Sequence, residues 1–413
     1  MIAHYFEAAH TLARLRCDPI GPFVDDFAGW LCEAGYARLT VRSHLCAVAH
    51  LGMWMRRAGL AIESFGELAL EAFAAHGPVC GCLRRDSRVD GPVVAGARLF
   101  FKHLRDRGIG SPAPPRCNGT PDIIERFEQC MCHHRGVAPA TLVAYRRVLI
   151  ELVRKNGTPD GYTASTLREF VSDRAAQHGR SHAKMAVTAV RMYLRYLAVQ
   201  GMCEARLVDA IPTFAGWRLS ALPAYMVAED VERLVGVPDP TTPLGRRDRA
   251  ILLLLARLGL RAGDIVALRL PDIDWTGGTL LVMGKGRRCS RLPLPQDVGD
   301  ALLAHLAPRT VGLNDDHVFL RACAPPRPFR SAGSVSSIVN RAAKRAGITP
   351  PRGGAHVLRH SLATAMVRGG IPLAAVGALL RHRSDDTTAL YAKVDVETLR
   401  KVARPWPVEV SPC

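Results

Sequence analysis

A histidine, an arginine and a second histidine lie three and four positions apart near the C-terminal end of the chain. These residues are His356, Arg359 and His360, and their spacing places them on one face if the segment is helical. A Gly-Gly pair and a second apolar run separate them from His382, and Tyr391 follows nine residues later. A proton-transfer group, a fixed cation and a phenol gathered in this way would suit chemistry at a phosphate.

Two further basic side chains stand upstream, each beside a different kind of predicted element. Arg261 lies in the stretch GLRAGD, directly after an apolar helical pattern over Arg246–Leu260. Lys285 lies in the stretch GKGRR between two short runs with β-branched residues, so we expect it at the tip of a turn. A small antiparallel meander inserted among helices is predicted from three such runs: Leu268–Asp274, Thr279–Met283 and Arg291–Leu294.

This order of Arg, Lys, His-x-x-Arg, His and Tyr, with a meander between the first two, resembles the signature of the tyrosine recombinase (phage integrase) family. The likeness extends to the surrounding residues: GLRAGDIVALRLPDID contains Arg261, HVLRHSLAT contains Arg359, and ALLRHRSDDTTALY ends at Tyr391. It covers residues 225–405. Residues 118–215 resemble the helical core-binding domain of the family more loosely.

The resemblance implies how the phosphate would be attacked and held. Tyr391 would attack the scissile phosphodiester, leaving a 3′-phosphotyrosyl linkage and a free 5′ hydroxyl. Arg261 and Arg359 would hold the non-bridging oxygens, and His382 would complete the hydrogen bonds of the phosphate. Planar cations at fixed positions stabilise the charge that spreads over the phosphoryl oxygens in the transition state.

Proton transfer falls, by the same resemblance, to Lys285 and His356. Lys285 would protonate the leaving 5′ oxygen, and His356 would assist removal of the phenol's proton. Asp264 lies where the family usually has an acidic residue that orients the site, and His360 is expected to support the site rather than to react. No cofactor and no metal are expected, because a covalent phosphotyrosine stores the bond energy for religation.

One position departs from the family's pattern. Arg381 precedes His382, where the family most often has Gly, and a bulky cation there would add a DNA contact or crowd the loop. Each site residue also has an ordinary structural explanation: Arg261 could pair with Asp264, and Tyr391 could be a core aromatic. All of these explanations would have to hold together, which favours the catalytic interpretation.

The charge of the chain favours a polyanionic partner. Its 413 residues carry a formal net charge of +18, and the pI is about 9.8. The excess is rich in arginine, which suits bidentate contacts to phosphate oxygens. Solvated surface charge in an Arg-rich proteome is the alternative that composition leaves open. Candidate phosphate contacts outside the catalytic set are Arg146, Arg147, Arg154, Lys155, Arg180, His182, Lys184, Arg191 and Arg195.

The N-terminus shows no secretory signal, and the most apolar run, 251–256, is too short to span a bilayer. We therefore expect no membrane association, a cytoplasmic location and twelve reduced cysteines. Two close pairs, Cys80-Gly-Cys82 and Cys130-Met-Cys132, have a spacing that is not common in zinc sites. We expect helix-facing thiols there rather than zinc.

Composition divides the chain into three parts. Residues 1–112 predict a helical module, and a Pro/Gly/Ser-rich stretch at 110–120 follows as a linker. Residues 118–215 predict a second helical, core-binding module. The helical pattern lapses over 212–223, before the catalytic part at 225–405. The predicted fold class is therefore mainly α and multidomain, with helical-bundle N-terminal modules and an α-rich catalytic domain that contains the meander.

The two helical modules share a plan. Gly35 and Thr40 are echoed by Gly136 and Thr141, and each Thr is predicted to begin a helix. A second similarity in sequence, near the end of each module, favours duplication of one module over a coincidence between similar amphipathic helices. In the first module, helices are expected at 23–34, 40–57, 63–75 and 93–107.

The predicted function is a site-specific DNA recombinase that acts as a homo-tetramer on two double-stranded DNA sites, for a mobile element such as a transposon or prophage. The segment Val394–Trp406 is expected to dock onto a neighbouring subunit. Two alternatives remain: a non-catalytic DNA-binding protein of the same fold, and a type IB topoisomerase-like enzyme that relaxes supercoils.

Overall fold

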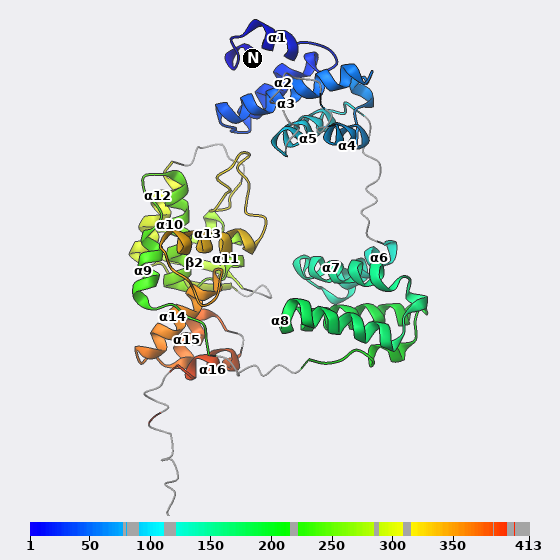
Figure 1. Ribbon diagram of the computed structural model, residues 1–413. Coiled ribbons are helices and arrows are strands. Elements are labelled where there is room, and N and C mark those ends of the chain that lie inside the picture. Colours follow the sequence, from blue (N-terminus) through cyan, green and yellow to red (C-terminus); the bar gives the residue numbers. More distant parts are fainter. Residues whose placement is uncertain are drawn as a thin grey trace, which may run out of the picture. The chain divides into compact units, whose positions relative to one another are not determined.

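The computed structural model describes residues 1–76, 80, 91–110, 121–214, 222–284, 289–308, 315–382, 384–394 and 400 (Figure 1). Two compact units make up the chain: residues 112–218 form one, and residues 1–111 with 219–413 form the other. Separate hydrophobic cores lie in residues 1–110, 121–214 and 222–394, and each is described by itself.

The described residues of the N-terminal module form five α-helices, one more than predicted: α1 (Ala9–Leu15), α2 (Gly21–Glu33), α3 (Arg38–Arg57), α4 (Glu67–Ala75) and α5 (Gly91–Asp106). The apolar stripe of α3 packs against α5, and they approach closely because Gly96 has no side chain; a Cβ there would lie 2.6 Å from that of Ala47. The prediction that Thr40 caps α3 is wrong. Ala37 occupies that position, in extended conformation, and Thr40 lies inside the first turn.

Residues 121–214 form a second helical module built from α6 (Asp122–Arg135), α7 (Pro139–Asn156) and α8 (Ala164–Val199). Thr163 caps α8 through reciprocal hydrogen bonds with Thr166, and Gly179 kinks this helix. As in the first module, the predicted threonine start is wrong: α7 begins at Pro139, which is favoured at a first helical position. The duplication of the two modules stays a prediction.

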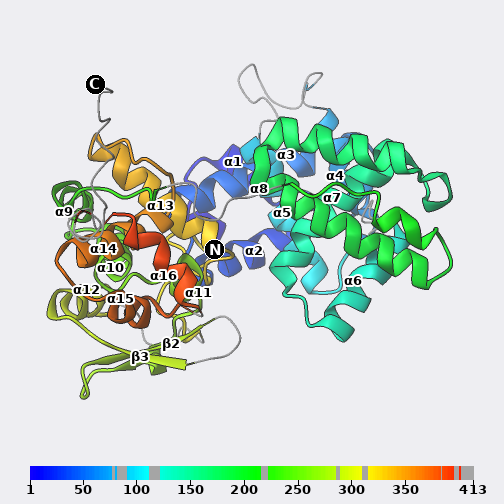
Figure 2. The same ribbon diagram turned by 90° about the horizontal axis from the view of Figure 1, so that it is seen from below.

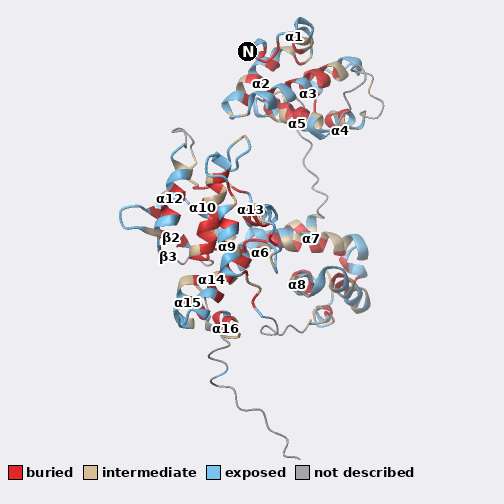
Figure 3. Cartoon of the chain, turned by 60° about the vertical axis from the view of Figure 1, so that its left-hand side comes forward, coloured by how far each residue is buried: buried red, intermediate tan, exposed pale blue. Residues whose placement is uncertain are grey.

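The C-terminal part is built around one buried helix. Its helices are α9 (Ala228–Gly236), α10 (Pro243–Leu258), α11 (Ala262–Ala267), α12 (Gln296–Leu306), α13 (Ala332–Arg345), α14 (His356–Arg368), α15 (Leu373–Leu380) and α16 (Asp385–Ala392). Residues 250–256 of α10 are all buried, because α9, α12, α13 and α14 surround them (Figure 3). This stretch of α10 is therefore apolar all round.

The predicted meander is present as a three-stranded antiparallel sheet in the order β1-β2-β3. The strands are β1 (Ile273–Asp274), β2 (Thr279–Met283) and β3 (Cys289–Pro293). The first strand is shorter than predicted, because Leu270–Asp272 form a turn of 3-10 helix and Arg269 forms an isolated bridge with His317. The mainly α fold with a small antiparallel sheet is thus confirmed.

Helices α14, α15 and α16 lie side by side and enclose a small satellite core (Figure 2). That core contains Ala363, Val367, Val376, Leu380, Tyr391 and Val394. The last predicted helix, Val394–Ala403, lies outside the described residues except for its first residue and Arg400. Among the described helices, none combines the length and apolar character needed to cross a membrane.

Candidate active site

Among the described residues of the predicted set, Arg359 is the most deeply buried cation. It projects from the first turn of α14, is 3% exposed, and donates hydrogen bonds to the carbonyls of Gly259 and Leu380. Gly259 ends α10 in the left-handed conformation with φ 57°. A Cβ at this position would lie 2.6 Å from the Leu380 side chain, so glycine, which adopts this φ without strain, suits the junction. The guanidinium therefore fastens the end of α10 to the end of α15.

Arg261 comes two residues after that glycine, at the start of α11. Its guanidinium donates to the carbonyl of Arg381 at 3.3 Å. Its backbone N–H donates to the Asp264 carboxylate at 2.9 Å, which fixes the turn that precedes α11. Arg261 and Arg359 thus meet at adjacent carbonyls at the C-terminal end of α15, where the partial negative charge of the helix favours cations.

The side chain of Arg381 points into the protein. Its Nη2 lies 2.6 Å from the Asp264 carboxylate, and the two side chains are 6% and 9% exposed. Its φ of 54° is the one positive value at a non-glycine position among the described residues. Left-handed backbone is easiest for glycine, which gives a physical reason for the glycine that the family usually has here.

The phenol of Tyr391 is buried beside a histidine. Tyr391 lies on α16, is 2% exposed, and its hydroxyl lies 2.8 Å from Nδ1 of His360 on α14. Burial raises the pKa of Tyr391, and the positive charge of Arg359 partly opposes that rise. The imidazole seen in contact with the phenol is therefore His360, which was expected only to support the site.

His356 begins α14 and presents an exposed face to solvent. Its ring meets that of His360 edge-on, with the ring centroids 5.1 Å apart. Partial desolvation of the ring by the surrounding protein lowers the pKa of His356, and the charges of Arg359, Arg352 and Arg261 lower it further. The ring of His356 is thus close to His360 and Tyr391, and its outer side is open to solvent.

The ring of His382 also lies close to the phenol. Its ring is parallel to that of Tyr391, with the centroids 6.3 Å apart, and its Nδ1 lies 2.7 Å from the hydroxyl of buried Thr388. Lys285, the sixth predicted residue, lies outside the described residues. The structure therefore brings five of the six predicted side chains together, from α11, α14, α16 and the turn after α15.

The electrostatics of this cluster favour an anion. Burial and the nearby charges of Arg261 and Arg381 lower the pKa of Arg359 to about 10. Burial and neighbouring positive charge lower the pKa values of His360 and His382 to about 4, so both rings are neutral at pH 7. Three guanidinium groups with one nearby carboxylate leave an excess of positive charge, which a phosphate would neutralise.

Sequence reasoning missed four supporting contacts. The carbonyls of Gly259, Leu380 and Arg381 hold the two arginines, and Thr388 holds His382. The threonine had a weak signal, since it is one helical turn before Tyr391. The carbonyl contacts had no signal in the sequence, because every residue type has a backbone carbonyl.

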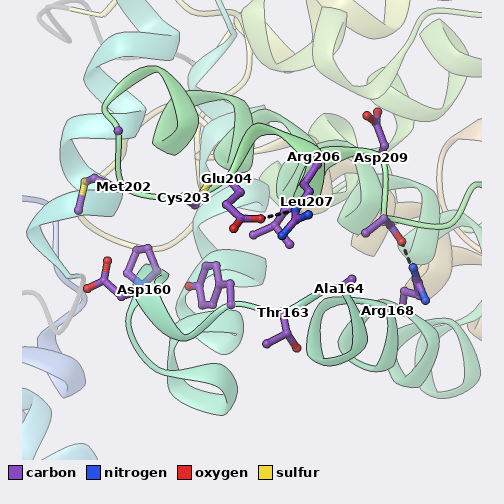
Figure 4. A pocket seen from close by; sticks show the side chains of 14 residues that line it. Asp160, Thr163, Ala164, Arg168, Met202, Cys203, Glu204, Arg206, Leu207 and Asp209 are labelled. Atoms are coloured by element: carbon purple, nitrogen blue, oxygen red, sulfur yellow. Dashed lines mark hydrogen bonds and ion pairs between the residues drawn. The ribbon is translucent and has the colours of Figure 1, made fainter.

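A hollow lies within the second helical module, which contains no residue of this cluster. It encloses about 900 Å³ between the start of α8 and residues 201–210 (Figure 4). Arg206 pairs with Glu204, and Arg168 donates to the carbonyl of Ala210. These charges are already satisfied within the module, so the hollow offers no counterpart of the arginine and tyrosine cluster.

Comparison with known proteins agrees with this arrangement. The phage integrase family matches residues 224–398. The y4rA protein of Sinorhizobium fredii, named as an integrase/recombinase, is 34% identical over 98% of this chain and 99% of its own length. This chain belongs to the phage integrase family. The tyrosine recombinase XerD of Xanthomonas axonopodis pv. citri is 32% identical over 68% of this chain and 95% of its own length.

Solved structures of the family share its fold. XerH bound to palindromic difH covers 87% of this chain and 96% of its own, at 17% identity and a TM-score of 0.53. A lambda integrase tetramer bound to a Holliday junction covers 79% of this chain and 90% of its own, at 18% identity and a TM-score of 0.52. As a tyrosine recombinase, this chain is a DNA strand transferase, which confirms the predicted class of enzyme.

Proposed function

We propose that this chain cuts and rejoins double-stranded DNA through a covalent bond between Tyr391 and a 3′ phosphate. The observation that carries the proposal is the burial of Arg359 beside two further guanidinium groups and the Tyr391 phenol. A cluster with this excess charge is costly unless it serves to bind an anion. A phosphodiester supplies that anion, and the phenol supplies the nucleophile.

In the proposed reaction, the Tyr391 oxygen forms a bond to phosphorus as the bond to the 5′ oxygen breaks. Arg261 and Arg359 hold the non-bridging oxygens, and His382 donates to the same phosphate. The phenol's proton passes to His356, whose outer side is open and whose lowered pKa keeps it neutral at pH 7. Lys285 gives a proton to the leaving 5′ oxygen. The reverse steps with a second 5′ hydroxyl rejoin the strands.

Tyr391 must move before it can attack. A hydroxyl on a side chain that is 2% exposed, and engaged with His360, cannot reach a phosphate on a DNA surface. Helix α16 is short, and the satellite core that it shares with α14 and α15 is small. We infer that DNA binding shifts α16 and transfers the phenol from His360 to the phosphate.

The two helical modules would hold the DNA backbone, as the domain division 1–112, 118–215 and 225–405 implies. Some of the predicted phosphate contacts are already engaged within the second module: Arg146 with Glu128, Lys155 with Glu169 and Asp173, and Arg191 with the carbonyl of Ile211. The better candidates are the exposed side chains of Arg147, Arg154, Lys184 and Arg195. Contacts of this kind fix position without reading sequence.

The assembly would be a homo-tetramer on two DNA sites, serving a mobile element. Support comes from the lambda integrase tetramer among the related folds and from the integrase/recombinase name of a full-length relative. Because the substrate is genomic or episomal DNA, we place the activity in the cytoplasm. The segment after Val394 is the candidate for contact with a neighbouring subunit. Val394 itself is 6% exposed in the satellite core, so a truncation that tests this contact should begin at Asp395.

The test uses nicked duplexes made from the DNA that flanks the gene in its source genome. Purified protein should form a denaturant-resistant adduct with a strand, and Tyr391→Phe should form none. An adduct that survives this substitution, or no adduct across the whole flanking region, would reject the proposed chemistry and favour a non-catalytic DNA-binding protein. Strand exchange that requires two matched sites separates a recombinase from a topoisomerase, which would relax any supercoiled plasmid.

A further inference from the structure

Two histidines and a cysteine from separate segments of the N-terminal module meet at one point. His50 lies in the middle of α3, His76 directly follows α4, and Cys80 comes four residues later. One potential ligand atom from each lies within 4.8 Å of the other two. Nε2 of His50 lies 3.2 Å from Sγ of Cys80.

The ring of His76 is oriented for ligation. Nδ1 of His76 lies 2.5 Å from the carbonyl of Phe73, an arrangement in which Nδ1–H donates to the carbonyl and Nε2 carries the lone pair. Metal-binding histidines almost always have such a second partner, which fixes the ring and its tautomer. His50 is 1% exposed, so packing holds its ring in place.

Aromatic side chains cover the cluster. The ring centroid of Phe73 lies 5.5 Å from that of His50 and 5.1 Å from that of His76. The ring centroid of Trp54 lies 5.9 Å from that of His76. Trp54 is one turn after His50 on α3, so the helix supplies both a ligand and part of the cover. An apolar shell limits access of water and strengthens the attraction between a thiolate and a cation.

The spacing fits zinc. In a tetrahedral site with Zn–N bonds of about 2.0–2.1 Å and a Zn–S bond of about 2.3 Å, nitrogen and sulfur ligands are about 3.5 Å apart. The 3.2 Å between His50 and Cys80 is close to this value, so a small adjustment would admit the ion. The Cys-x-Cys spacing argued against zinc in the sequence, but that argument concerned neighbouring cysteines. Here the partners of Cys80 are histidines from α3 and from the end of α4.

We propose that His50, His76 and Cys80 bind one zinc ion that fastens the end of α4 to the middle of α3. Binding would replace the proton of the Cys80 thiol, which leaves to solvent, and the remaining position of the tetrahedron would take water or another group of the chain. The ion would stabilise the N-terminal module and takes no part in the chemistry at Tyr391. The proposal therefore stands whether or not the proposed DNA reaction holds.

The test measures metal in the full-length, tag-free protein after growth with zinc and gel filtration. Elemental analysis should find about one zinc per chain, and His76→Gln and Cys80→Ser should each lower this value to about a tenth or less. Both substituted side chains are half-buried, whereas His50 lies in the core, so these variants are the ones expected to fold. The matched controls are His10→Gln and Cys132→Ser, which replace exposed residues outside the cluster and should keep the zinc.

Cobalt gives a second measurement that does not depend on zinc retention. The zinc-free protein titrated with Co²⁺ should show the visible bands of a tetrahedral ion and a thiolate-to-cobalt charge-transfer band, and Cys80→Ser should lose the latter. Chelation should also lower the melting temperature of the wild type and leave that of Cys80→Ser unchanged. Zinc content that stays the same in the two cluster variants, or a cobalt spectrum without the thiolate band, would overturn the proposal.

Discussion

The hydroxyl of Tyr391 lies 2.8 Å from Nδ1 of His360, and both groups come from helices of the same satellite core. The nucleophile of the proposed reaction is thus held by a partly buried hydrogen bond. This contact couples the stability of α16 to the state of the catalytic phenol.

The coupling can be measured by a double-mutant cycle. His360→Leu and Tyr391→Phe each leave a buried polar atom without its partner, so each should lower the free energy of unfolding by about 1–3 kcal/mol. The double variant should lose less than the sum, by about 0.5–3 kcal/mol, because neither partner remains. Urea unfolding of the four proteins gives these values. Strictly additive losses would mean that the contact contributes nothing to stability.

The buried pair of Asp264 and Arg381 predicts an asymmetric response to substitution. Asp264→Asn leaves the Arg381 guanidinium buried without its counter-charge, and should cost about 3–5 kcal/mol. Arg381→Gly should cost less, because glycine relieves the left-handed backbone at φ 54°. The double variant should be more stable than Asp264→Asn alone. Thermal and urea unfolding test this order, and equal losses in the two single variants would contradict it.

The two histidines beside Tyr391 predict a pH dependence of stability. The folded state lowers the pKa values of His360 and His382 from 6.5 to about 4. Between these values the unfolded chain binds more protons than the folded chain, so the free energy of unfolding rises with pH from 4 to 6.5. Destabilisation therefore develops as the pH falls through this window.

Comparison with a variant isolates that effect from other histidines. The slope of the unfolding free energy against pH is proportional to the number of protons taken up on unfolding. In His360→Gln/His382→Gln, this number should be smaller than in the wild type by up to about two. Urea titrations at several pH values supply both slopes. Parallel curves for the two proteins would show that neither ring changes its protonation on folding.

Thr388 offers a test of how His382 is positioned. Thr388→Val keeps the buried shape but removes the hydroxyl that lies 2.7 Å from Nδ1 of His382. Loss of this hydrogen bond should weaken the placement of the ring by about 1–1.5 kcal/mol, or roughly 5- to 10-fold in cleavage rate. The neighbouring, exposed Thr387→Val is the matched control and should leave the rate unchanged. DNA affinity should stay constant in both, so an affinity loss without a rate loss would count against a positioning role.

Several features of this protein were determined by the sequence alone. The apolar stripes predicted most of the helices, because helical spacing is a local property of the chain. The alternation and turns between Ile273 and Pro293 predicted the meander for the same reason. The ordered set from Arg261 to Tyr391 indicated phosphoryl transfer, and membership of the phage integrase family agrees with it.

Other features were decided only by the tertiary structure. His360 rather than His356 contacts the phenol, because packing of α16 on α14 selects between two histidines on one helix face. Arg381 turns inward because Asp264, 117 residues away in the chain, lies within reach of its guanidinium. Cys80 meets His50 across 30 residues in the same way. Contacts at such separations depend on how helices pack, which local residue patterns do not specify.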